Sequence, residues 1–256
     1  MNLIALPAFT DNYIWMFDDG SQAVVVDPGD AAPVFSALAS RGLTLAGILV
    51  THHHADHVGG VDALRAALEG PVYGPARENI PAPFIPLAEG DSVEVLGRRF
   101  SVIDIPGHTA GHIAYHHAPS QGEPVLFCGD TLFSAGCGRL FEGTPAQMHD
   151  SLSKLAALAP QTLVCCGHEY TLSNLKFAQA VEPGNQSIAG HASRCTEQRR
   201  RGEPTLPSSL SLEQQINPFL RCDQPSVIDA ARRHGTTSDD PVAVFAALRQ
   251  WKNEFR

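Results

Sequence analysis

Short apolar runs, rich in β-branched residues, alternate with turn signals and amphipathic stretches over the first two thirds of the chain. The short runs predict strands at residues 13–17, 23–26, 47–50, 71–73, 100–105, 113–116, 125–128 and 162–166. The amphipathic stretches predict helices at residues 32–41, 58–67, 144–157 and 173–181. Elements that alternate in this way are typical of an α/β domain whose sheets are covered by helices.

The pattern changes after residue 181. The sequence Glu-Pro-Gly-Asn at residues 182–185 is a break, and no strand-like run follows it. Helical patterns occupy residues 188–201, 212–217, 225–234 and 241–255. We therefore predict an α/β domain followed by a small α-helical C-terminal domain.

Four of the predicted strands are each followed by histidine or aspartate. The strand at 47–50 leads into Thr-His-His-His-Ala-Asp-His at residues 51–57, and three later strands end at a glycine followed by His108, Asp130 or His168. Glycine permits a tight exit turn, and α/β folds place their chemistry in loops at strand ends. A single histidine after a strand is usually structural, but this set of seven does not arise readily by chance: His52, His54, Asp56, His57, His108, Asp130 and His168.

Imidazole and carboxylate ligands suit zinc, iron or manganese, and seven of them are too many for one ion and about right for two. His53 lies between two of these residues and is expected to point away. The remaining histidines have no second partner nearby in the sequence, so we expect solvated or hydrogen-bonded roles for them. Asp27 is expected to buttress the histidine loop.

Composition narrows the possible partners and location. Eighteen basic and twenty-seven acidic residues give a net charge of −9, which argues against a nucleic-acid partner because a phosphate backbone favours a basic face. The N-terminal residues lack the pattern of a secretory signal, and the longest apolar runs are too short to cross a bilayer. Six scattered cysteines are read as reduced structural thiols. These features predict a cytoplasmic protein with no membrane association.

The motif T-H-x-H-x-D-H, with a later His, Asp and His, resembles the metallo-β-lactamase superfamily. The chain is most similar to the glyoxalase II branch, the hydroxyacylglutathione hydrolases, and the similarity extends over essentially its whole length. Further motifs of that branch are FTDNYIW at 9–15, VDPG at 26–29, GDTLF at 129–133, GCGR at 136–139, GHEYT at 167–171, VEPGN at 181–185 and NPFLR at 217–221. The resemblance implies an αββα sandwich over residues 1–168, which is the catalytic domain, followed by a small α-helical substrate-binding domain over residues 169–256.

The resemblance also implies two divalent metal ions, with zinc the expected metal and iron or manganese also accepted. It places His52, His54 and His108 on one ion. It places Asp56, His57 and His168 on the other, with Asp130 bridging both. Asp56 and Asp130 are therefore the expected catalytic residues as well as ligands.

Four residues match positions that bind glutathione in this family: Arg139, Tyr170, Arg249 and Lys252. Phe141 stands where some members have a tyrosine, so the phenol contact of those members is absent here. Each match has a plainer reading. Arg249 and Lys252, three residues apart on one helix, also fit an ordinary solvated surface, and Tyr170 fits a packing role between domains. We favour binding because the carboxylates of glutathione require cations in an otherwise acidic protein.

The resemblance therefore implies a monomeric thioesterase that converts S-(2-hydroxyacyl)glutathione, typically S-D-lactoylglutathione, to D-lactate and glutathione through a metal-bridging hydroxide. This reaction is the second step of methylglyoxal detoxification. A thiolate leaving group, whose conjugate acid has a pKa of about 8.5, needs no general acid.

The nearest competing function is that of a glutathione persulfide dioxygenase with a single iron. The metal motif is also compatible with a different hydrolase of the superfamily, such as a β-lactamase or ribonuclease, and with a non-catalytic binding protein. The second ligand set favours two metals and therefore the hydrolase.

Overall fold

The computed structural model describes residues 2–255, which form two compact units. The first unit contains the residues up to 104, residues 110–129 and residues 165–168. The second contains residues 105–109, residues 130–164 and the residues from 169 onward. The predicted boundary between residues 168 and 169 stays a prediction.

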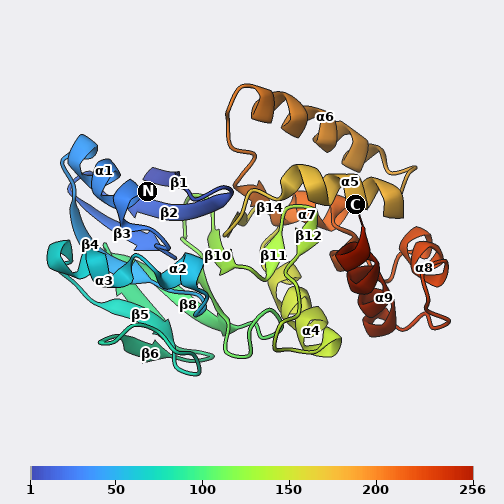
Figure 1. Ribbon diagram of the computed structural model, residues 1–256, viewed down its shortest axis with the longest axis horizontal. Helices are drawn as coiled ribbons and strands as arrows, with labels where there is room; N and C mark the ends of the chain where they lie inside the picture. The colour runs from blue at the N-terminus through green and yellow to red at the C-terminus, as the bar shows by residue number, and fades with distance from the viewer. Residues whose placement is uncertain (1, 256) are drawn as a thin grey trace. The chain divides into compact units, whose positions relative to one another are not determined.

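A six-stranded sheet forms one layer of the first unit (Figure 1). Its strands, in spatial order, are β1 (Asn2–Ala8), β2 (Asn12–Asp18), β3 (Gln22–Val26), β4 (Thr44–Leu49), β5 (Val72–Pro75) and β6 (Ile85–Leu87). Strand β2 pairs antiparallel with both β1 and β3, and the pairs from β3 through β6 are parallel. The sequence predicted four of these strands; β1 and β6 were missed.

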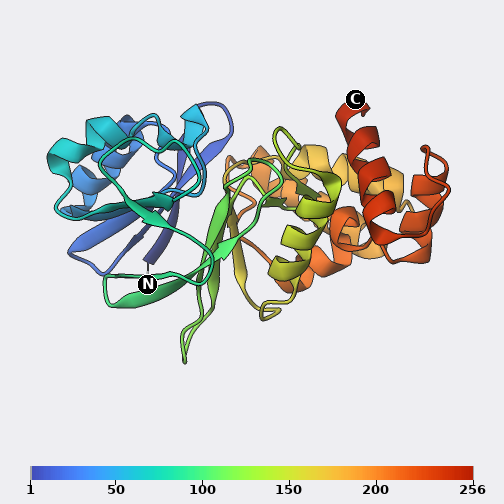
Figure 2. The ribbon, with the colours of Figure 1, turned by 90° about the horizontal axis from the view of Figure 1, so that it is seen from below.

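Helices cover one face of this sheet (Figure 2). They are α1 (Ala31–Arg41), α2 (Ala55–Val58), α3 (Val61–Leu64) and the 3₁₀ turn η1 (Arg65–Ala67). The prediction of one helix over residues 58–67 was wrong, because the chain is interrupted at Gly59 and Gly60. A Cβ on Gly60 would lie 2.6 Å from the carbonyl oxygen of Pro28, so this turn needs glycine in order to lie against the loop after β3.

The opposite face of the sheet packs on a second sheet of the first unit. That sheet has the order β7 (Ser92–Val95), β8 (Arg98–Asp104), β9 (Ile113–His117), β10 (Val125–Gly129) and β13 (Leu163–Cys166). Phe17 on β2 contacts Phe100 and Phe127 across the interface, with ring centroids 5.4 and 5.8 Å apart. Met16, the preceding residue, belongs to the core beneath the helices. The strand therefore divides its alternate side chains between two apolar layers.

The second unit contains a short hairpin, β11 (Leu132–Phe133) and β12 (Gly136–Cys137), and the helix α4 (Pro145–Ala156). Thr144 and Gln147 form a capping box at the start of α4, and Pro145 lies in its first turn. The two-residue strand β14 (Ser208–Ser209) pairs with the first residues of β13.

The predicted C-terminal helices are confirmed. They are α5 (Thr171–Val181), α6 (Gln186–Arg200), α7 (Leu210–Ile216), α8 (Pro225–Arg232) and α9 (Pro241–Glu254), with a 3₁₀ turn η2 (Pro218–Leu220) after α7. Helices α5 and α6 lie side by side (Figure 1). All six cysteines are buried thiols, as predicted. Within residues 2–255, no helix has the length and apolar character needed to cross a membrane.

Candidate metal centre

The histidine loop of the first unit begins where β4 ends and is anchored by Asp27. Oδ1 of Asp27 accepts a hydrogen bond from the Thr51 amide, and Oδ2 accepts one from the Thr51 hydroxyl, both at 2.7 Å. Oδ2 also lies 3.1 Å from Nδ1 of His57. The predicted buttressing role of Asp27 is confirmed.

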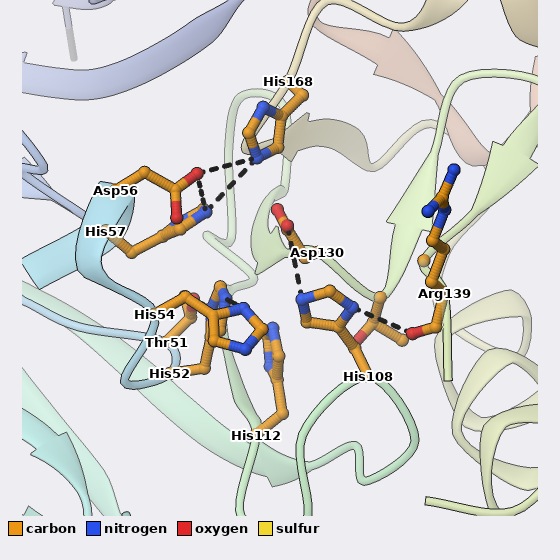
Figure 3. A network of polar contacts seen from close by, with 12 residues as sticks. Thr51, His52, His54, Asp56, His57, His108, His112, Asp130, Arg139 and His168 are labelled. Atoms are coloured by element: carbon orange, nitrogen blue, oxygen red, sulfur yellow. Dashed lines mark hydrogen bonds and ion pairs between the residues drawn. The ribbon is translucent and has the colours of Figure 1, made fainter. Parts of the chain in front are cut away.

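Asp56, His57 and His168 converge in the first unit (Figure 3). Nε2 of His57 lies 3.4 Å from Nε2 of His168 and 3.6 Å from Oδ2 of Asp56, and the remaining distance, from His168 Nε2 to Asp56 Oδ2, is 3.4 Å. Ligands bonded to zinc at ~2.0–2.1 Å in a tetrahedron are ~3.3 Å apart. The three atoms therefore have the spacing of one face of a tetrahedral metal site.

Acceptors behind the two imidazoles fix which nitrogen carries the proton. Nδ1 of His57 faces Asp27, and Nδ1 of His168 lies 2.9 Å from Oδ1 of Asp11. An ionised carboxylate only accepts hydrogen bonds, so each Nδ1 donates and each Nε2 keeps its lone pair for the cluster. This is the tautomer that a metal ligand requires.

Asp11, in the turn between β1 and β2, and Asn12, the first residue of β2, make two contacts that were not predicted. Besides Asp11, Asn12 donates from Nδ2 to Oδ2 of Asp56 at 2.9 Å, which is the oxygen nearest the two imidazoles. Both residues belong to the FTDNYIW motif, so the sequence marked them as family residues but did not indicate which side chains they contact. Asn12 and Asp11 orient a carboxylate and an imidazole of the same cluster.

His52 and His54 also converge, with Nε2 of His52 3.2 Å from Nδ1 of His54. The ring of His112 stacks on His52 at a centroid distance of 4.5 Å. His53, as predicted, is directed to a different partner: its Nδ1 lies 2.7 Å from Oε2 of Glu78. Oε1 of Glu78 accepts the Gly111 amide at 3.0 Å, so this buried carboxylate ties together two loops of the first unit.

In the second unit, His108 and Asp130 lie together (Figure 3). Nε2 of His108 is 3.4 Å from Oδ2 of Asp130, again the spacing of two ligands on one ion. Nδ1 of His108 is 2.9 Å from the carbonyl oxygen of Arg139, which can only accept, so Nδ1 is the donor here too. Gly107 and Gly129, which precede the two ligands, have φ of 152° and 46°. The predicted need for glycine at these two strand exits is confirmed.

Comparison with known proteins assigns the chain to a family. Residues 8–168 match the model of the metallo-beta-lactamase superfamily, and residues 169–255 match the model of the hydroxyacylglutathione hydrolase C-terminus. A hydroxyacylglutathione hydrolase from Albidiferax ferrireducens is 61% identical over 255 residues and is covered completely, as is this chain. The chain belongs to the hydroxyacylglutathione hydrolase family. The predicted fold class, a metallo-β-lactamase fold followed by a helical C-terminal region, is thereby confirmed.

Solved structures agree with this fold. ETHE1 from Myxococcus xanthus is similar over 100% of both chains, with 25% identity and a TM-score of 0.66. TTHA1623, solved in a di-iron-bound form, is covered completely by 86% of this chain, with 28% identity and a TM-score of 0.60. The His and Asp clusters and the shared fold indicate that this hydroxyacylglutathione hydrolase family member binds metal ions.

The four residues matched to glutathione binding all lie in the second unit, in unlike surroundings. Arg139 is exposed, and Tyr170 is partly exposed with its ring edge-on to Phe133 at 5.2 Å. Lys252 is half-buried; its ammonium donates to the Ser173 carbonyl oxygen at 3.1 Å. Burial, together with the nearby charge of Arg249, lowers the pKa of Lys252 to about 8.

Arg249 differs from the solvated reading that its helical spacing allowed. The side chain is buried, and Nη1 donates to the carbonyl oxygen of Cys137 at 2.8 Å. Its guanidinium also lies 5.2 Å from the ring centroid of Phe219. Phe141, the position of the tyrosine in some relatives, is exposed and stands edge-on to His108 at 5.2 Å.

Proposed function

We propose that this chain is a thioesterase that hydrolyses S-(2-hydroxyacyl)glutathione, typically S-D-lactoylglutathione, to the hydroxy acid and glutathione. This is the second step of methylglyoxal detoxification. The observation that carries the proposal is the 61% identity to a hydroxyacylglutathione hydrolase over the full length, which includes the C-terminal helical region as well as the metal motif.

We propose that His52, His54 and His108 bind one divalent ion. Asp56, His57 and His168 bind the other, and Asp130 bridges the two. The separations of 3.2 to 3.6 Å between neighbouring ligand atoms within each unit support this assignment. Zinc is the metal proposed, because these distances fit tetrahedral sites of nitrogen and oxygen ligands; iron and manganese accept the same ligands.

Bound divalent ions supply Lewis-acid chemistry, lowering the pKa of water and stabilising the negative charge that develops on a carbonyl oxygen. The residues of the chain supply orientation. Asp56 is the solvent-facing member of its cluster, with a side chain 42% exposed against 1% for His57. Held by Asn12, its carboxylate accepts a hydrogen bond from the attacking water and directs it.

The leaving group does not need a proton from a general acid of the protein. A glutathione thiol ionises at a pKa of about 8.5, so the thiolate departs unaided at neutral pH. Arg139, Arg249 and Lys252 supply positive charge for the glutathione carboxylates, and Tyr170 supplies a phenol and an aromatic face. In this proposal, glutathione binding belongs to the second unit.

We further propose that the enzyme is a cytoplasmic monomer. The six buried thiols suit a reducing compartment, in which glutathione is also kept reduced. All the proposed ligands and substrate contacts come from one chain.

Hydrolysis of S-D-lactoylglutathione, measured together with metal content, tests the proposal. The purified chain should contain two metal equivalents and release glutathione, and a chelator should abolish both. A chain that binds one iron and consumes oxygen with glutathione persulfide, but does not cleave the thioester, would instead be the dioxygenase.

A further inference from the structure

A hairpin of residues 132–137 lies between Asp130 and Arg139 in the chain, and its tip is buried in the helical part of the second unit. Leu132 pairs with Cys137, and Phe133 with Gly136. Ala135, at the tip, is fully buried and belongs to an apolar cluster with α5, α6 and α7. Its φ of +54° is unfavourable for alanine, so neighbouring contacts must hold it.

Helix α7 provides the closest of these contacts. Oε2 of Glu213 accepts the Ala135 amide at 2.7 Å. Asn217, directly after α7, donates from Nδ2 to the carbonyl oxygens of Phe133 and Gly136 at 3.1 and 2.9 Å. It also donates to Oε2 of Glu213 at 3.2 Å, so the two side chains form one network around the hairpin tip.

Two more helices donate hydrogen bonds to the hairpin backbone. From α5, Nδ2 of Asn174 donates to the Ser134 carbonyl oxygen at 3.1 Å, and from α9 Arg249 donates to the Cys137 carbonyl oxygen. These side chains and those on α7 are all buried. The hairpin is thus attached to three helices through its backbone, which fixes its position rather than its side-chain chemistry.

The base of the hairpin contacts the proposed ligands Asp130 and His108, so the position of the hairpin affects theirs. The Gly138 amide donates to the Thr131 carbonyl oxygen at 3.1 Å. A Cβ on Gly138 would lie 1.9 Å from the carbonyl oxygen of Asp130, so the two legs are in close contact. The next residue, Arg139, accepts the hydrogen bond of His108 Nδ1. A shift of the hairpin would therefore move both Asp130 and the acceptor that orients His108.

A buried carboxyl at position 213 is costly for stability, because burial raises its pKa and the hydrogen bonds from Ala135, Ser208, Ser134 and Asn217 only partly offset this. An apolar residue would fill the same space without that cost. The carboxyl contributes an acceptor for a hairpin whose backbone would otherwise lose its partner.

We propose that Glu213 and Asn217 are positioning residues of the metal centre, which hold the hairpin so that Asp130 and His108 meet a metal ion in the required geometry. This inference rests on the ligand assignment in the proposed function. It gives the helical region a second task besides substrate binding, which is to set the affinity of the metal site.

The test uses two substitutions at one position. The hydrogen bonds from the Ala135 amide and from Asn217 both end on the same oxygen of Glu213, Oε2. In Glu213→Gln the amide oxygen can take that place, whereas Glu213→Leu removes the acceptor and keeps the volume. The matched control is Glu182→Leu, because Glu182 is also a buried carboxylate of the helical region but pairs with Arg221 at 2.8 Å, away from the hairpin.

The readouts are the affinity for Zn²⁺, by chelator competition, and the absorption spectrum of the Co²⁺-substituted protein, neither of which depends on thioester turnover. Glu213→Leu should weaken Zn²⁺ binding by about tenfold and alter the cobalt spectrum, which is the size of effect expected when a residue that orients a metal ligand is removed. Glu213→Gln should restore both readouts. Glu182→Leu should lower the melting temperature and leave both unchanged.

If Glu213→Leu does not fold, Asn217→Ser takes its place, because serine can still cap η2 but cannot donate to both hairpin carbonyls. Unchanged zinc affinity and cobalt spectrum in the folded variant would overturn the proposal, as would an equal loss in Glu182→Leu. A wild-type chain that binds two metals without cleaving S-D-lactoylglutathione would overturn the proposed function alone.

Discussion

Oδ1 of Asp11 lies 2.9 Å from Nδ1 of His168, at the opposite side of the ring from the nitrogen that faces Asp56. The contact fixes both the tautomer and the ring orientation of the histidine. Asp11→Ala should therefore lower the affinity of the proposed site at Asp56, His57 and His168 by about tenfold or more. Chelator competition with Zn²⁺ measures this loss.

The control for Asp11 is Asp62→Ala, which removes an exposed carboxylate of the same unit that pairs with Arg65 on the surface. Its zinc affinity should equal that of the wild type. Equal affinities in all three proteins would mean that the orientation of His168 does not depend on Asp11.

Asp130→Asn tests the proposed bridge. An amide keeps the size of the side chain but removes the charge that two cations would share, so metal content and thioesterase activity should fall together. Metal analysis on the purified variant, beside its rate with S-D-lactoylglutathione, gives both values. Full activity with two metals retained would remove Asp130 from the bridging position.

The ligand positions were predictable because each follows a strand whose apolar run is visible in the sequence. Residues that support the ligands were harder to predict. Glu78 and Asn12 come from distant segments, and nothing in their local sequence indicates which loop they contact. The buttressing role of Asp27 was predictable, because this residue directly follows a predicted strand and belongs to the VDPG motif.

Errors in the predicted elements arose from tertiary contacts. The helix expected over residues 58–67 is interrupted because Gly60 lies against the Pro28 backbone, a contact absent from any local pattern. The burial of Arg249 is of the same kind. Its helical spacing fits a solvated surface equally well, and only the packing of α9 near Cys137 decides between the two.

Gly129→Ala should damage the histidine loop. Gly129 has a φ of +46°, and a Cβ there would lie 2.2 Å from the Thr51 hydroxyl and 2.8 Å from the His112 ring. Thr51 would have to move, together with the hydrogen bonds that it gives to Asp27. We expect a loss of about 2 kcal/mol or more in the free energy of unfolding, measured by denaturant titration. Gly122→Ala is a suitable control, since its φ is also positive but nothing lies within 4 Å of the added carbon.

The lowered pKa of Lys252 predicts how substrate binding depends on pH. With a pKa of about 8 in the folded chain, the ammonium is charged below that pH and loses its proton above it. Attraction for a glutathione carboxylate is therefore present at pH 7 and lost as the pH rises through about 8. KM for S-D-lactoylglutathione should rise by about tenfold between pH 7 and pH 9.5.

Lys252→Arg separates this effect from other titrations, because a guanidinium stays charged throughout the range. Its KM should not show the rise near pH 8. A small thioester without glutathione serves as the second control. Its KM should be the same in the wild type and in Lys252→Arg at every pH. The same rise in the arginine variant would assign the titration to another group.

Arg249→Ala and Lys252→Ala should differ, although the two residues lie on one helix face. Removing Arg249 leaves the carbonyl oxygen of Cys137 without its buried donor, at a cost of about 2 kcal/mol, or roughly 5 °C in melting temperature. Lys252→Ala should lower the stability less, because Lys252 is half-buried and bound to one carbonyl oxygen.

Lys252→Ala should raise KM for glutathione thioesters alone. Because Arg249 also holds the hairpin between Asp130 and Arg139, its loss should slow a small thioester as well. Should the small thioester be unaffected, Arg249 would act on the substrate only, and the double variant would then raise KM for glutathione thioesters without lowering kcat.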